Sequence, residues 1–64
     1  MINNDILNRL GKIFKLDHEQ ICQVFTLGGL NFKPEQLAKC FLEKNETAYQ
    51  PLLDVELASF LNGL

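Results

Sequence analysis

The side chains that could take part in chemistry are few in this chain, and they are widely spaced. His18 is the only histidine and lies between Asp17 and Glu19, in a stretch that resembles the exposed first turn of a helix. A zinc site needs several imidazole or thiolate ligands at short spacings, and none accompany His18. We therefore expect His18 to be a solvated surface residue, and we expect neither a metal nor a cofactor.

The two cysteines, Cys22 and Cys40, each lie in an apolar helical pattern without the spacing of a redox or zinc motif. A nucleophilic thiolate needs an adjacent base and an electropositive setting, which neither helix clearly provides. Cysteine without redox chemistry behaves as a small hydrophobic residue. We expect free, buried thiols in a cytoplasmic protein, with a disulfide as the alternative.

A third possible chemistry is acid and base catalysis by four carboxylates: Glu43, Glu46, Asp54 and Glu56. Such catalysis needs a cleft whose environment separates the pKa values of the two groups. A chain of 64 residues seldom forms such a cleft, and no glycine-rich phosphate loop or nucleophile elbow is present. We expect a solvated acidic rim with helix-capping members, in a protein that is not an enzyme.

Length and composition predict one small globular domain, residues 1–64. Hydrophobic residues make up 47% of the chain and charged residues 22%, which excludes a disordered class. The formal net charge of −2 gives no general attraction to nucleic acid or anionic lipid. No apolar run approaches the roughly 18 residues that a membrane span requires.

The first predicted helix begins at Asn3, Asn4 and Asp5, which are residue types that cap and start helices. Its apolar stripe, which we expect to face the core, consists of Ile6, Leu7, Leu10, Ile13 and Phe14. Gly11 lies inside the helix, where glycine costs about 1 kcal/mol relative to alanine. We therefore expect Gly11 to mark a close helix crossing.

Asp17 and Gln20 have the spacing of a capping box and predict the start of a second helix. The residues that it turns inward are Ile21, Val24 and Phe25. A glycine pair then stops the helix. With Gly29 in the left-handed conformation, Leu30 would contact Phe25 in a Schellman motif.

Pro34 and Glu35 suit the first turn of a third helix, since proline lacks an N–H there and the helix dipole favours a carboxylate. Its inner stripe is predicted as Leu37, Ala38, Phe41 and Leu42, with Cys40 at the margin. Residues 46–50 could hold a fifth, one-turn helix before Pro51.

The last predicted helix runs from Asp54, as its cap, to Gly63. Its apolar residues, spaced as one helix face, are Leu57, Phe60, Leu61 and Leu64. No segment alternates as a strand does, and no hairpin turn signal joins two apolar runs. The sequence therefore predicts an all-α fold, a compact bundle of four helices with non-parallel crossings.

Four short motifs resemble the YehS-like family of bacterial proteins of unknown function. They are Asn3-Asn4-Asp5-Ile6-Leu7, Leu27-Gly28, Glu35-Gln36-Leu37-Ala38 and Ser59-Phe60-Leu61-Asn62-Gly63-Leu64. The resemblance implies a helical repeat and a cytoplasmic location, and it carries no activity, cofactor or catalytic residue to transfer. Members of the family typically contain two tandem repeats, whereas this chain is similar to one.

Our leading hypothesis is a non-catalytic protein–protein interaction module whose partner is a second copy of the repeat, as in a homodimer. The expected interface residues lie on the outward edges of the third and last helices: Phe41, Phe60 and Leu64. The alternative for each of these residues is a place in the core of the domain. The alternative is a nucleic-acid-binding accessory domain that uses the basic residues of the first helix, Arg9, Lys12 and Lys15.

Overall fold

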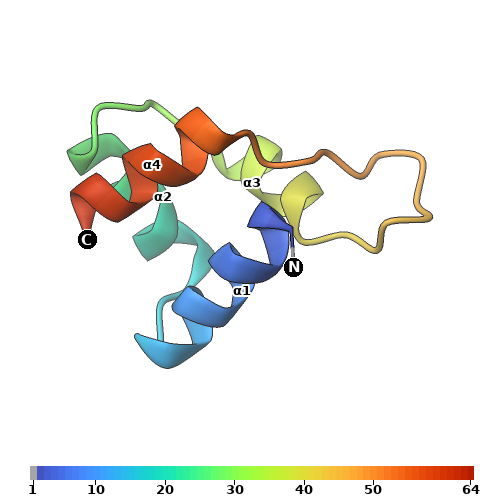
Figure 1. Ribbon diagram of the computed structural model, residues 1–64, viewed down its shortest axis with the longest axis horizontal. Coiled ribbons are helices and arrows are strands. Elements are labelled where there is room, and N and C mark those ends of the chain that lie inside the picture. Colours follow the sequence, from blue (N-terminus) through green and yellow to red (C-terminus); the bar gives the residue numbers. More distant parts are fainter. Residues whose placement is uncertain (1) are drawn as a thin grey trace.

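Four α-helices and no strands make up residues 2–64, which a computed structural model of the protein describes. The helices are α1 (Asn3–Ile13), α2 (His18–Leu27), α3 (Pro34–Cys40) and α4 (Asp54–Gly63). Helix α2 is central, with α3 and α4 packed against it, and α1 contacts α4 (Figure 1). The predicted all-α fold of four helices is confirmed.

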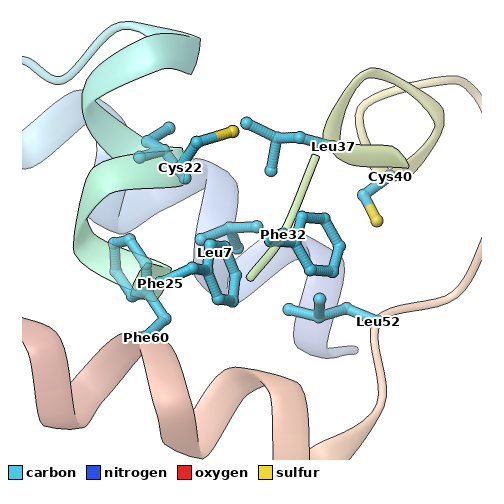
Figure 2. Packing of buried hydrophobic residues seen from close by; sticks show 9 residues of the cluster. Leu7, Cys22, Phe25, Phe32, Leu37, Cys40, Leu52 and Phe60 are labelled. Atoms are coloured by element: carbon cyan, nitrogen blue, oxygen red, sulfur yellow. The ribbon is translucent and has the colours of Figure 1, made fainter. Parts of the chain in front are cut away.

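Phe25 of α2 lies at the centre of the core and is fully buried. Its ring stacks on Phe32 with a centroid distance of 4.6 Å and meets Phe60 of α4 at 5.2 Å in a tilted arrangement. Leu7 of α1 and Leu37 of α3 are also fully buried in this cluster (Figure 2). Each helix therefore contributes at least one large apolar side chain to a single core.

The closest helix crossing joins the C-terminal ends of α2 and α4 through two glycines. A Cβ atom built on Gly28 would overlap the carbonyl oxygen of Ser59 and lie 2.6 Å from its carbonyl carbon. A Cβ atom on Gly63 would overlap the carbonyl oxygen of Val24 and lie 2.9 Å from its carbonyl carbon. These two glycines let the backbones of α2 and α4 touch.

Gly11 of α1 is buried, and its position is tight, as its place inside a helix suggested. A Cβ atom built there would lie 3.2 Å from Cδ1 of Ile21. This neighbour is the tip of a side chain rather than another backbone, so the approach at Gly11 is less rigid than the glycine crossing of α2 and α4.

Both local motifs predicted for the ends of α2 are confirmed. At its start, Oδ1 of Asp17 accepts the amide of Gln20 at 2.8 Å, and Oε1 of Gln20 accepts the amide of Asp17 at 2.9 Å. At its end, Gly29 has a φ of 95°, and the amide of Leu30 donates to the carbonyl of Phe25 at 2.9 Å. These are the bonds of a capping box and a Schellman motif.

Helix α1 begins at Asn3 as predicted, whereas the predicted cap of α4 is wrong. Asn3 and Asp54 are the first residues inside their helices, and the N-cap positions belong to Ile2 and Leu53. At Leu53 the backbone amide donates to Oε1 of Glu56 at 2.8 Å. The Asn3 side chain is used elsewhere, because its Nδ2 donates to Oδ1 of Asp54 at 2.6 Å and so joins the starts of the two helices.

The segment after α3 also differs from its prediction. Helix α3 ends at Cys40, whose side chain is buried in the core rather than at its margin. No fifth helix forms over residues 46–50, where the amide of Tyr49 donates to the carbonyl of Glu46 at 3.1 Å and closes a single turn. A helix is disfavoured there because the residue before Pro51 avoids the α conformation.

Candidate interaction surface

An apolar stripe leaves the core along one edge of α1, and another leaves it along one edge of α4. Each stripe has three residues spaced i, i+4 and i+7: Ile6, Leu10 and Ile13 on α1, and Leu57, Leu61 and Leu64 on α4. The last residue of each stripe is largely exposed, Ile13 at 69% and Leu64 at 50%. Val24 of α2 is half-buried beside them. We call the seven residues the α1/α4 face: Ile6, Leu10, Ile13, Val24, Leu57, Leu61 and Leu64.

The opposite edges of α1 and α4 point away from the two stripes. On α1, Asn8 and Lys12 line a cavity on the side of α3. On α4, Ser59 and Gly63 lie against α2. The starts of the helices are joined by the Asn3 hydrogen bond, and Figure 1 shows α1 and α4 diverging from there with α2 between them. The remaining edges therefore border one surface.

The seven side chains that define the α1/α4 face are aliphatic and uncharged. Exposed apolar area costs roughly 25 cal/mol per Å² relative to burial. Scattered apolar residues are ordinary on a protein surface, whereas a contiguous patch indicates a docking site. Ile13, Leu61 and Leu64 are the members of the α1/α4 face that are at least half exposed.

The structure does not bring the three predicted interface residues together. Phe60 is 0% exposed, so its assignment to a partner surface is wrong, and its ring belongs to the core beside Phe25. Phe41 is half-buried after α3 and stacks on His18, away from α4. Only Leu64 lies on the α1/α4 face.

Sequence periodicity assigned Ile6, Leu10 and Ile13 to the core. Leu10 does pack against the core, whereas Ile6 is only half-buried and Ile13 is 69% exposed, so periodicity missed the surface positions of these two. The signal that could have found them is the width of the apolar stripe on the first helix. Five apolar residues cover more of the helix circumference than one short neighbour can bury, and of those five only Leu7 is fully buried.

The three basic residues of the alternative hypothesis line two adjacent hollows that share Lys12. Lys12 and Lys15 line the cavity between α1, α2 and Phe41. Arg9 lies outside that cavity, in a hollow of about 420 Å³ that it shares with Asp5, Asn8 and Lys12. The carboxylate of Asp5 therefore offsets the positive charge of Arg9, and the positively charged surface is smaller than the sequence suggested.

Asn4 has a structural role that sequence reasoning missed. Its side chain is 7% exposed, and its Nδ2 donates to the carbonyls of Cys40 at 2.9 Å and Gln50 at 3.0 Å. Its Oδ1 accepts the amide of Leu52 at 2.8 Å. One side chain of α1 thus fixes both ends of the connection between α3 and α4. An asparagine near a helix start suggests a cap, and only the fold reveals the clamp.

Both thiols are free and buried, in agreement with the preferred prediction. Burial raises the pKa of Cys22, and the nearby Glu19 carboxylate adds to this rise. Burial also raises the pKa of Cys40 to about 11, with a further contribution from Glu56. In the view of Figure 2 the side chain of Leu37 lies between them. Neither thiol has the lowered pKa of a reactive cysteine.

The remaining candidate residues lie at the surface or at helix starts. His18 is exposed, as expected, and its ring stacks on Phe41 with a centroid distance of 4.7 Å and an interplanar angle of 13°. Glu43 and Glu46 are exposed in the connection between α3 and α4. At the start of α4, Asp54 accepts a hydrogen bond from the Asn3 side chain and Glu56 accepts one from the Leu53 amide. Within residues 2–64, no three His, Cys, Asp or Glu side chains gather as metal ligands would.

None of the helices in this described part of the chain has the length and apolar character needed to cross a membrane.

Comparison with known proteins identifies relatives without an assigned activity. The chain is 34% identical, over all 64 of its residues, to the uncharacterized protein YehS of Escherichia coli (strain K12). It spans 41% of the length of that relative. No solved structure matches it. The family described as protein of unknown function DUF1456 matches residues 3–64, and the chain therefore belongs to the DUF1456 family.

Proposed function

We propose that this chain is a non-catalytic protein–protein interaction module that self-associates through the α1/α4 face. The observation that carries the proposal is the set of aliphatic side chains along α1 and α4, of which Ile13, Leu61 and Leu64 are each at least half exposed. The free thiols are consistent with a reducing, cytoplasmic location, which we propose with it.

A second copy is a suitable partner for this face, because an uncharged patch meets its own copy without placing like charges opposite each other. A self-complementary patch closes on itself with twofold symmetry. A standard interface buries about 800 Å² on each partner. That area is about a fifth of the 4393 Å² accessible surface of this chain, so one face can supply it.

Sedimentation equilibrium from low to high micromolar concentration tests the proposal. We expect the wild-type chain to form a dimer and Leu61→Lys to weaken dimerisation at least about 100-fold, since two unpaired ammonium groups would meet in the apolar interface. Val55→Lys is the matched control. Val55 is also exposed on α4 but lies outside the α1/α4 face, so this variant should dimerise as the wild type does.

Two results would contradict the proposal. A wild-type chain that stays monomeric at every concentration removes self-association. Equal dimerisation of Leu61→Lys and Val55→Lys places the interface somewhere other than the α1/α4 face.

A further inference from the structure

One surface cavity of this small chain has a volume of about 420 Å³ and another has a volume of about 370 Å³. The second of these has an unusual lining. It lies between the C-terminal half of α1, the start of α2 and the residue that follows α3. Its volume is at the lower end of the range for small-molecule sites. The lining residues are Asn8, Gly11, Lys12, Lys15, Leu16, His18, Ile21 and Phe41.

The charge of this cavity is opposite to that of the whole chain. Its lining contains the two ammonium groups of Lys12 and Lys15 and no carboxylate, whereas the chain has a formal net charge of −2. Two carboxylates flank the lining residue His18 in sequence: Asp17, whose Oδ1 caps α2 by accepting the amide of Gln20, and the exposed Glu19. The cavity is therefore suited to an anionic group.

One wall of the cavity is flat and aromatic. The rings of His18 and Phe41 stack with an interplanar angle of 13°. Behind them, Gly11 and Ile21 are buried and form the back of the cavity. Stacked rings provide a surface on which another planar ring can pack.

The backbone of Lys15 supplies an independent observation. Lys15 has a φ of 55° in the turn that ends α1, where the amide of Leu16 donates to the carbonyl of Gly11 at 2.8 Å. The corresponding position after α2 is Gly29, with a φ of 95°. A lysine in this conformation costs on the order of 1 kcal/mol, and such strain is concentrated at functional sites. The left-handed Lys15 closes a Schellman motif at the end of α1, and its side chain lines the cavity.

We propose that this cavity binds a phosphate ester that carries a planar ring. Lys12 and Lys15 hold the phosphate oxygens, and the ring packs on the His18 and Phe41 pair. The phosphate ester comes from a free nucleotide or from a nucleotide of a single strand. The cavity lies on the edge of α1 opposite the α1/α4 face, so this inference does not depend on self-association.

Amide chemical shifts of the labelled protein, followed by NMR at low salt, test the proposal with three probes: inorganic phosphate, adenosine monophosphate and a short single-stranded oligonucleotide. We expect shifts at the cavity residues that saturate in the submillimolar range for at least one nucleotide probe. The variant Lys12→Gln/Lys15→Asn should weaken binding at least about 10-fold, and asparagine keeps the left-handed turn. Arg9→Gln is the matched control and should change affinity less than about twofold.

The probes also separate the two parts of the site and the two sources of the ligand. Phe41→Leu should weaken adenosine monophosphate and leave inorganic phosphate unchanged, since only the nucleotide carries a ring. Binding of the oligonucleotide alone would support a single strand as the source. Absence of saturable shifts at the cavity for all three probes would overturn the proposal. Equal weakening by Arg9→Gln and by the double variant would do the same, because it indicates diffuse charge attraction.

Discussion

Replacing Gly28 with alanine should separate α4 from α2. The φ of Gly28 is −83°, which alanine adopts without strain, and alanine would even reduce the entropy of the unfolded chain. The obstacle is contact alone: the new Cβ would lie 2.6 Å from the carbonyl carbon of Ser59, whereas non-bonded carbons pack best at about 3.5–4.0 Å. Helix α4 would therefore have to move by at least about 1 Å, and it carries Phe60 into the core beside Phe25.

The expected loss is most of the stability of the domain. Overpacking typically costs about 1–3 kcal/mol when side chains can adjust. Here backbone meets backbone, and part of the packing of Phe60, of the order of 3–5 kcal/mol for complete removal of a buried phenylalanine, is lost as well. We expect a decrease of at least about 3 kcal/mol in the free energy of unfolding, against roughly 3–5 kcal/mol for a domain of this size.

Urea unfolding followed by circular dichroism measures this effect, with two other glycines as controls. Gly29→Ala meets nothing within 4 Å and should lose only about 1 kcal/mol, from its φ of 95°. Gly11→Ala should also destabilise, but by less than Gly28→Ala, because the Ile21 side chain can shift. A Gly28→Ala variant within about 1 kcal/mol of the wild type would refute the close crossing.

Three further predictions concern single residues. Lys15→Gly should stabilise the chain by about 0.5–1 kcal/mol, seen as a higher melting temperature, because it relieves the left-handed lysine; a lower melting temperature would contradict this. Asn4→Leu should destabilise by about 2–4 kcal/mol and expose amides of the connection to α4 to hydrogen exchange, since three backbone groups lose their partner; unchanged exchange at Leu52 would count against the clamp. With a pKa of about 11, Cys40 should be only about 0.1% thiolate near pH 8 and react with a disulfide reagent far more slowly in folded than in unfolded protein. Its raised pKa also means that the stability it contributes is complete below about pH 9 and is lost as the pH rises through about 11.

Features that depend on neighbouring residues could be predicted from the sequence. The capping box of Asp17 and Gln20 and the turn at Gly29 each require only a few consecutive residues with suitable chemistry. The burial of Phe25 follows from the period of the helix that carries it. These local rules were sufficient for the number of helices, their order and the all-α class.

Features that depend on distant residues could not be predicted in this way. Asn4 has the chemistry of a helix cap, yet its partners are more than thirty residues away in sequence. Gly28 and Gly63 each resemble a helix stop, and their contact exists only because α2 and α4 cross. Periodicity alone gives the apolar face of a helix but not how much of it a neighbour covers, so Phe60 and Leu64 could not be separated into core and surface.

The most direct test of self-association is an isotope-filtered NMR experiment on a sample that mixes labelled and unlabelled chains. Only contacts between two copies produce signals in this measurement. The proposal predicts signals between the methyl groups of Leu61 or Leu64 in one copy and residues of the α1/α4 face in the other. Signals that instead involve Val55 and the opposite side of α4, or no intermolecular signals at high micromolar concentration, would contradict the α1/α4 face as the site of self-association.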